Sequence, residues 1–201
     1  MKILITGANG MLAKAVRKRF EEHELILTDV TNFEKLDITN SEEVNKFVAE
    51  VKPDVIINCA AYTAVDKAES DEDLARKINS DGPRNLAAAA SKNNCKLVHI
   101  STDYVFGGEL SLDEIYKEDD QKAPETAYGR TKLAGEEAIK ENAKEFYIFR
   151  TAWLYGDGNN FVRTMLKLGK EREKVSVVYD QHGSPTYAVD LADIIYQALE
   201  K

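Results

Sequence analysis

Short apolar runs alternate along this chain with longer segments of helical periodicity, and this alternation is what most constrains the fold. The runs are rich in β-branched residues and lie at residues 2–6, 24–29, 54–60, 96–102, 145–151 and 174–180. Strands that are apolar throughout and separated by helices are typical of a parallel sheet buried on both faces. We therefore predict an α/β fold, with a doubly wound parallel sheet and helices on both faces.

The segments between these runs set the expected helices, which cover residues 11–22, 41–51, 71–93, 126–142, 160–171 and 189–199. Ser41 should cap the second helix, with Glu42 and Glu43 in its first turn, where the helix dipole favours acidic side chains. The Gly82–Pro83 pair should kink the third helix. Residues 107–125 are acidic and follow neither period, which predicts a surface loop or the margin of a lid.

Length and charge exclude several classes of protein. A chain of 201 residues suits one domain, which we expect to extend over residues 1–201. The net charge of -8 argues against a nucleic-acid partner, because the phosphate backbone demands clustered Lys and Arg. No apolar run approaches membrane-spanning length, and the first one is too short for a signal peptide. We therefore expect no nucleic-acid partner and no membrane association.

The cysteines and histidines give no sign of a metal site. Cys59 and Cys95 lie among apolar residues at the ends of expected strands, which favours two reduced thiols and a cytoplasmic location. His23, His99 and His182 are far apart, and no metal-ligand spacing joins them. We therefore predict that the protein binds no metal.

The first expected strand runs directly into the sequence "TGANGMLA", where Gly7 and Gly10 lie between strand and helix. A glycine there lets the backbone approach a pyrophosphate, and the helix amino terminus offers free N–H groups. Ala13 is small enough for the helix to pack near the strand. The spacing differs from G-x-G-x-x-G, but its place after the first strand predicts dinucleotide binding by residues 7–12, in a Rossmann-type domain.

Acidic and small residues follow the next strands. Asp29 ends the second strand, where a carboxylate can accept hydrogen bonds from adenosine ribose and repel a 2′-phosphate. This favours NADH slightly over NADPH, although a plain strand-end Asp is the alternative. Asp37 follows where an adenine amino group could be bound. Ala60 and Ala61 end the third strand and leave room for a dinucleotide to cross.

Tyr128 and Lys132 lie one helical turn apart in "AYGRTKLAGE", and the preceding strand ends in Ser101, Thr102 and Asp103. A free tyrosine has a pKa near 10, and a lysine ammonium nearby favours the phenolate and lowers that pKa. The tyrosine could then exchange a proton with a carbonyl while a nicotinamide exchanges the hydride. An amphipathic helix with an exposed lysine is the alternative, which the glycine turn makes weaker.

Six blocks carry a resemblance to a known family: "ITGANGML", "NCAAYTAVDKAE", "STDYVFGG", "YGRTKLAGE", "RTAWLYGDGNNFV" and "DQHGSPT". In this order the chain resembles the extended short-chain dehydrogenase/reductases and, within them, the dTDP-4-dehydrorhamnose reductase family. The resemblance implies NADH- or NADPH-dependent reduction of the 4-keto group of a nucleotide-linked deoxysugar, dTDP-4-dehydro-L-rhamnose, to dTDP-L-rhamnose. A catalytically weak regulatory protein on the same fold, or a nucleotide-sugar epimerase or dehydratase, is the alternative.

The resemblance also implies roles for individual residues. Thr102, Tyr128 and Lys132 would be catalytic, with Thr102 and Tyr128 on the keto oxygen. Trp153 would contact the sugar, with a core position as the alternative. The expected substrate contacts are Val65, Thr102, Asp103, Tyr128 and Trp153. The expected cofactor contacts are Gly7, Asn9, Gly10, Met11, Leu12, Asp29, Asp37, Ile38, Cys59, Ala60, Ala61, Thr63, Tyr128 and Lys132.

Two departures from the family pattern affect these expectations. Ala13 replaces the third glycine, a mild change that leaves cofactor binding plausible. Lys201 follows soon after the last expected helix, whereas the family continues with carboxyl-terminal elements that bind substrate. The resemblance therefore implies that these elements are missing, that cofactor binds better than substrate, and that an open pocket favours self-association as a homodimer.

Overall fold

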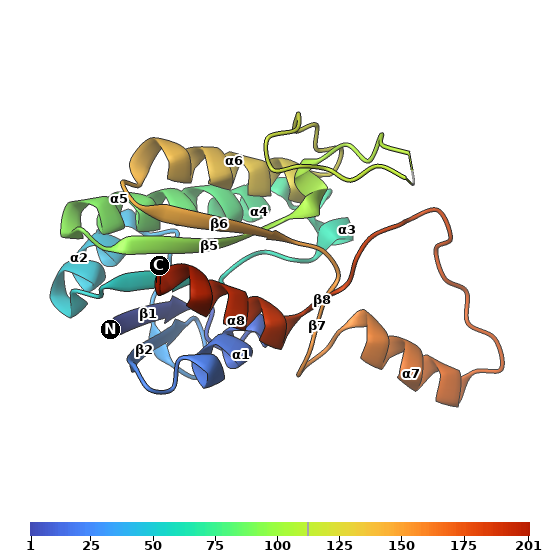
Figure 1. Ribbon diagram of the computed structural model, residues 1–201, viewed down its shortest axis with the longest axis horizontal. Helices are drawn as coiled ribbons and strands as arrows, with labels where there is room; N and C mark the ends of the chain where they lie inside the picture. The colour runs from blue at the N-terminus through green and yellow to red at the C-terminus, as the bar shows by residue number, and fades with distance from the viewer. Residues whose placement is uncertain (112) are drawn as a thin grey trace.

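The structure is a computed structural model that describes residues 1–111 and 113–201. It contains a six-stranded sheet in the order β3-β2-β1-β4-β5-β6, with every neighbouring pair parallel (Figure 1). The strands are β1 (Lys2–Thr6), β2 (Glu24–Asp29), β3 (Glu34–Lys35), β4 (Val55–Asn58), β5 (Lys96–Thr102) and β6 (Phe146–Thr151). The predicted parallel α/β sheet is confirmed.

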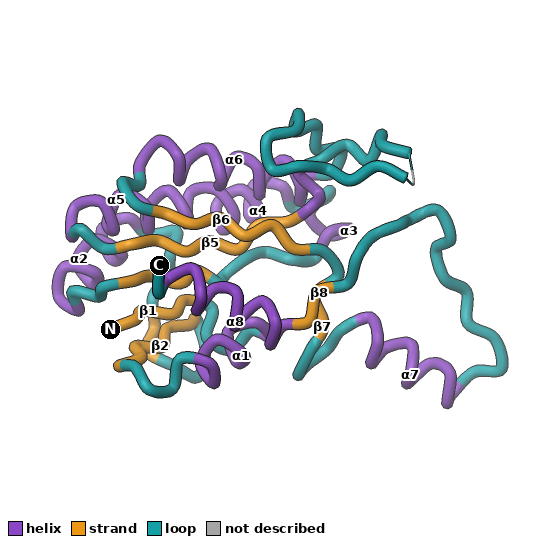
Figure 2. Tube along the Cα trace, in the orientation of Figure 1, coloured by secondary structure: helices purple, strands orange, loops and turns teal. Residues whose placement is uncertain are grey.

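Helices cover both faces of this sheet (Figure 2). The α-helices of the described residues are α1 (Met11–Arg19), α2 (Ser41–Val51), α3 (Val65–Ala68), α4 (Glu72–Arg76), α5 (Gly82–Asn93), α6 (Ala127–Asn142), α7 (Phe161–Glu171) and α8 (Ala188–Leu199). Successive strand residues point to opposite faces. In β1, Ile3 and Ile5 pack with α1 and α8, whereas Leu4 packs with α2, α5 and α6. This double burial explains why the strands are apolar throughout.

The strand order reverses between β1 and β4, which are neighbours in the sheet although they are distant in the chain. Ligands of open α/β sheets bind beyond the carboxyl ends of the strands at such a switch point. The segment after β1 contains the glycine turn, and the segment after β4 contains Ala60 and Ala61. The topology therefore brings two predicted cofactor segments to one edge.

Several helix ends differ from the predictions. The cap of α2 is Asn40, whose side-chain Oδ1 accepts from the N–H groups of Glu42 and Glu43, so the predicted Ser41 cap is wrong. Asn40 has the better acceptor geometry because its backbone is extended, while Ser41 is already helical. The first helix ends at Arg19, since Phe20 leaves the helical conformation.

The predicted helix over residues 71–93 is one helical run with a local change of winding. It consists of α4, a π-helical turn at Lys77–Asp81 and α5, which begins at Gly82. The irregularity therefore precedes the Gly82–Pro83 pair, and Pro83, which has no backbone N–H to donate, comes directly after the π-helical turn. A π-helical turn inside an α-helix often lies near a functional site.

The predicted strand at residues 174–180 is wrong. These residues are irregular, and Val177, Val178 and Tyr179 are exposed. The β-branched pattern pairs with no neighbouring strand there, because the segment follows α7 away from the open edge of the sheet at β6. Two short strands flank this region instead and pair in parallel, β7 (Leu154–Tyr155) and β8 (Thr186–Tyr187). Helix α7 and the segment that follows it extend away from the sheet (Figure 1).

The acidic segment at 107–125 contains no helix or strand in its described part, as predicted, and Leu112 lies outside the described residues. Arg150 of β6 donates to the Glu118 carbonyl and lies over the Phe106 ring, which stacks on Tyr116. The segment is thereby attached to the sheet. Within residues 1–111 and 113–201, no helix is long and apolar enough to span a membrane.

Candidate active site

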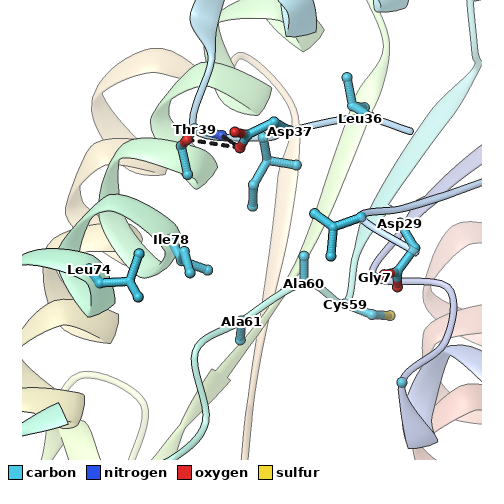
Figure 3. A pocket seen from close by; sticks show the side chains of 13 residues that line it. Gly7, Asp29, Leu36, Asp37, Thr39, Cys59, Ala60, Ala61, Leu74 and Ile78 are labelled. Carbon is cyan, nitrogen blue, oxygen red and sulfur yellow. Dashed lines mark hydrogen bonds between the residues drawn. The ribbon is translucent and has the colours of Figure 1, made fainter. Parts of the chain in front are cut away.

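A cavity of about 440 Å³ opens at the switch point, within the range of small-molecule sites (Figure 3). The glycine turn and the segment after β4 form its floor, while Leu74 and Ile78 line it from α4 and the π-helical turn. The predicted cofactor residues that line it are Gly7, Gly10, Asp29, Asp37, Ile38, Cys59, Ala60 and Ala61. The structure therefore brings these eight residues together from four separate segments.

The glycine turn has the shape that a pyrophosphate requires. Gly7 has φ +65°, and a side chain there would place Cβ 2.6 Å from the Ala60 amide nitrogen. At Gly10 an added Cβ would meet only the Gly7 carbonyl oxygen, at 3.1 Å, so the turn is open on its outer side. No side chain caps α1, which leaves its first N–H groups free for an anion. The residues present fit the phosphates of a dinucleotide.

The other residues of this turn have structural contacts as well. Leu12 is buried in the core, so only its backbone N–H can face a ligand. Met11 packs beside Gly156. The Asn9 side chain donates to the Thr31 carbonyl. These three predicted cofactor residues fix the turn's position, and none lines the cavity.

Both acidic residues at the cavity rim already accept hydrogen bonds. Asp29 accepts from the N–H groups of Asn9 and Thr31, at 3.1 and 3.2 Å. Asp37 accepts from the backbone N–H and the hydroxyl of Thr39, as the dashed lines in Figure 3 show. Each oxygen of Asp29 retains a further lone pair for a ligand, and at Asp37 the oxygen that does not accept from Thr39 stays open to one. Asp29 therefore shapes the turn and lines the cavity, and its contact with a ribose stays a prediction.

The predicted catalytic residues meet where β5 passes under α6. Thr102 is the last residue of β5, and Lys132 of α6 donates from Nζ to the Ile100 carbonyl of the same strand, at 2.5 Å. The Thr102 hydroxyl lies near the Tyr128 phenol, whose pKa it lowers. Thr126 caps α6 by accepting from the Gly129 N–H, which fixes the turn that carries Tyr128.

The predicted lowering of the Tyr128 pKa by Lys132 is wrong for this structure. Burial raises the pKa of the Tyr128 phenol to about 12, against the smaller lowering by Thr102. The lysine does not favour the phenolate because its Nζ faces Ile100 and the His99 ring. Burial lowers the pKa of Lys132 itself to about 8. The phenol is therefore suited to donate a proton and the lysine titrates near neutral pH.

The shifted pKa of Lys132 predicts an unusual dependence of stability on pH. Its folded pKa of about 8 lies below the ordinary 10.5, so the unfolded chain binds the proton more tightly. Stability should therefore rise between about pH 8 and pH 10.5 and be lowest below that window. Relative to Lys132→Met, the wild-type free energy of unfolding should increase by about 2 kcal/mol from pH 7 to pH 9.5, measured by urea denaturation. An unchanged difference between the two proteins would contradict the buried, titrating lysine.

The expected sugar contacts are less tightly grouped. Thr102 donates to the Asp103 carboxylate at 3.1 Å, and burial raises the pKa of Asp103. Val65 begins α3 and is half-buried, while Thr63 before it is exposed. Trp153 has φ +44° and is 44% exposed beside Gly183, so a core position for it is excluded and sugar contact stays a prediction.

Sequence reasoning missed several polar residues under this site. Asn79, in the π-helical turn, accepts from the Tyr62 N–H and donates to the Tyr62 carbonyl and the Thr131 hydroxyl. Asn58 and His99 form a second buried pair with Nδ2 to Nδ1 at 3.0 Å. An amide and an imidazole inside otherwise apolar strands were the available signal, because such groups need buried partners.

Comparison with known proteins shows that this chain is similar to dTDP-4-dehydrorhamnose reductases. The family model described as "RmlD substrate binding domain" matches residues 1–201. The dTDP-4-dehydrorhamnose reductase of Mycolicibacterium smegmatis is 44% identical over 201 residues, which are 99% of this chain and 60% of that protein. The chain thus spans about three fifths of that relative's length.

Solved structures agree with the sequence comparison. A dTDP-4-dehydrorhamnose reductase from Clostridium acetobutylicum is 53% identical with a TM-score of 0.94, covering 100% of this chain and 70% of that one. The Bacillus anthracis enzyme of the same name, solved in complex with NADP, is 48% identical with a TM-score of 0.93, covering 100% and 72%. With the family model matched from end to end and the fold shared, this chain belongs to the RmlD substrate-binding-domain family.

Proposed function

We propose that this chain binds NADH or NADPH at the switch point and supplies the groups that reduce the 4-keto group of a dTDP-linked deoxysugar. The reaction would convert dTDP-4-dehydro-L-rhamnose to dTDP-L-rhamnose. The observation that carries this proposal is that Tyr128 and Lys132 lie one turn apart on α6, over the end of β5 that carries Thr102, with Lys132 close to Cys59 of the cavity lining. The relatives named dTDP-4-dehydrorhamnose reductase, one of them solved with NADP, support the same reaction and cofactor.

Each residue of the trio has a defined task in this proposal. Tyr128 donates its phenolic proton to the keto oxygen as that oxygen becomes an alkoxide, and the Thr102 hydroxyl holds the same oxygen. Lys132 holds the nicotinamide ribose from the helix side. The cofactor, when bound, supplies the hydride. A phenol whose pKa burial raises to about 12 remains protonated at neutral pH, which suits a general acid in the reducing direction.

The direct test is an absorbance assay of cofactor oxidation with NADH or NADPH and dTDP-4-dehydro-L-rhamnose. Oxidation of the cofactor that depends on the sugar nucleotide supports the reductase. Cofactor-dependent thermal stabilisation without sugar-dependent oxidation would instead favour a dinucleotide-binding protein without turnover. Chemical identification of the product separates reduction from epimerisation or dehydration.

Three broader proposals accompany this one. Residues 1–201 would act as a single dinucleotide-binding domain, because both helix layers pack on one sheet. The free thiols of Cys59 and Cys95 support a cytoplasmic location. A homodimer is supported by α7, where Phe161 and Leu166 are exposed on one helix. Sedimentation equilibrium over a range of concentrations tests the last proposal.

Asp29→Asn should weaken discrimination between the two cofactors. The amide keeps an oxygen for the Asn9 N–H of the glycine turn and gives up the exposed hydrogen bond from the Thr31 N–H, while the negative charge that repels a 2′-phosphate is lost. The ratio of NADPH to NADH affinity should rise by about tenfold, or roughly 1.4 kcal/mol, in calorimetric titrations. An unchanged ratio with an intact fold would remove Asp29 from the ribose site.

A further inference from the structure

Three buried polar side chains form a line from the centre of the sheet to the catalytic helix. They are Asn58 at the end of β4, His99 in β5 and Lys132 on α6, each about 1% exposed. Asn58 Nδ2 lies 3.0 Å from His99 Nδ1, and His99 Nε2 lies 3.2 Å from Lys132 Nζ. Every hydrogen in this line must be assigned to one partner, because buried polar groups are seldom left unpaired.

The orientation of the Asn58 amide is fixed by its other contacts. Its Oδ1 accepts from the Ala60 N–H at 3.1 Å and from the Thr6 hydroxyl at 2.7 Å. A backbone N–H can only donate, so the oxygen has to face Ala60 and the NH₂ group has to face His99. The amide therefore donates to His99 Nδ1, and that ring nitrogen is the acceptor.

This assignment determines the rest of the line. A neutral imidazole whose Nδ1 accepts carries its proton on Nε2, and His99 Nε2–H then points at Lys132 Nζ. An ammonium group has no lone pair and cannot accept that hydrogen bond, whereas a neutral amine can. The same Nζ still donates to the Ile100 carbonyl. The geometry thus accommodates a neutral lysine with each named contact satisfied.

We propose that His99, held in its Nε2–H form by Asn58, is a positioning residue that stabilises the neutral amine of Lys132 and thereby sets the pH at which this lysine takes up a proton. The effect of the Lys132 protonation state on turnover rests on the function proposed above. The protonation of the lysine itself does not depend on that function.

The charged groups around Lys132 do not by themselves fix its pKa, so His99 can also affect that pKa. Burial lowers the pKa of Lys132 to about 8, while Glu136 on α6 and Cys59 after β4 raise it. The Glu136 carboxylate is already bound by Arg150 of β6, with two hydrogen bonds. Tyr128 stays a neutral phenol, because burial raises its pKa to about 12.

His99 itself remains uncharged. Burial and the facing Lys132 lower its pKa well below the ordinary 6.5. At physiological pH the ring therefore contributes a fixed N–H dipole and no charge. In an active reductase, the positive charge beside the nicotinamide ribose would vanish as pH rises past the pKa of Lys132, which connects the line to catalysis.

Nuclear magnetic resonance of the protein without ligands tests the proposal directly. Long-range ¹⁵N spectra report which nitrogen of His99 carries the proton, and ¹³Cε-labelled lysine reports the pKa of Lys132, assigned with Lys132→Met. We expect the Nε2–H form and a lysine that titrates near pH 8. A proton on Nδ1, or a lysine that titrates near its ordinary 10.5, overturns the proposal.

Two variants then reverse the assignment. Asn58→Asp keeps an oxygen for Ala60 and accepts from His99 Nδ1–H, so Nε2 becomes an acceptor that favours the ammonium. His99→Gln frees an amide oxygen to face Nζ. Each should raise the pKa of Lys132 by about one pH unit or more, whereas exposed His182→Gln should leave it unchanged. If neither folded variant moves this pKa, His99 does not control it.

The two variants also keep the experiment decisive if one of them does not fold. Should Asn58→Asp fail to fold, His99→Gln and the wild-type spectra still decide the question. Because these spectra need no cofactor or sugar nucleotide, an inactive protein with the predicted tautomer supports the inference while contradicting the proposed reduction. An active protein whose His99 carries the proton on Nδ1 supports the proposed reduction while contradicting the inference.

Discussion

In the reduction of dTDP-4-dehydro-L-rhamnose proposed for this chain, Tyr128→Phe is expected to lower kcat by a factor on the order of 10² to 10⁴, the usual contribution of a general acid. The variant removes only the hydroxyl, which lies near Thr102 at the end of β5. The ring still packs against Ala68 and Ala127, so the fold should persist. Steady-state kinetics measure the loss, and calorimetry should show NADH affinity within a few-fold of wild type, because the glycine turn is untouched.

Tyr104→Phe is the matched control. Its ring packs edge-on against Tyr128 with centroids 5.7 Å apart, so the same kind of atom is removed from a neighbouring ring. We expect turnover within a few-fold of wild type, since this hydroxyl has no proposed role in proton transfer. Near-normal turnover by Tyr128→Phe would remove that tyrosine from the mechanism. Equal losses in both variants would indicate disturbed packing.

The largest effect on stability is expected from Arg150→Met. Glu136 is fully buried, and Arg150 binds both of its carboxylate oxygens, with Nε–Oε1 2.8 Å and Nη2–Oε2 2.6 Å. Removing the arginine leaves an uncompensated buried charge, which costs about 3 to 5 kcal/mol in the free energy of unfolding. Urea denaturation at neutral pH measures this loss.

The double variant Arg150→Met/Glu136→Met separates the buried charge from other effects of the arginine. Replacing both partners removes the isolated charge, so most of the lost stability should return. The single variant should also recover as pH falls, because burial then raises the pKa of Glu136 above the ordinary 4.5 and protonation favours the folded state. A pH-independent deficit that persists in the double variant would locate the cost in the Arg150 contacts to Glu118 and Phe106.

The strands β1, β4 and β5 could be predicted from the sequence because they are buried on both faces and each is followed by a helical segment, whereas the short exposed strand β3 carried no such pattern. The glycine turn could also be predicted, since the sequence alone places it directly after the first strand. The Asn40 cap was missed because Asn and Ser stand side by side there, and only backbone conformation selects between them. The strand expected at 174–180 failed because strand propensity needs a neighbouring strand to pair with.

The sequence could predict that several candidate residues lie near one another, but it could not predict their protonation states. Spacing placed Tyr128 and Lys132 on one helical turn, and that much holds. It could not show that the lysine faces His99 and Ile100, because those contacts depend on how β5 lies under α6. The Asn58 amide, which fixes the ring proton, belongs to a different strand again. Electrostatics at this site therefore arise from tertiary packing across three elements.

The central position of β1 also has a consequence for the order in which the protein is made. β1 leaves the ribosome first, yet one of its two neighbours in the sheet is β4, Val55–Asn58. A nascent chain that ends before β4 has β1 open along one side, and Gly7 lacks the Ala60 backbone against which its turn is fitted. The earliest sequence signal of dinucleotide binding is thus completed only when a segment about fifty residues further along has been synthesised and paired.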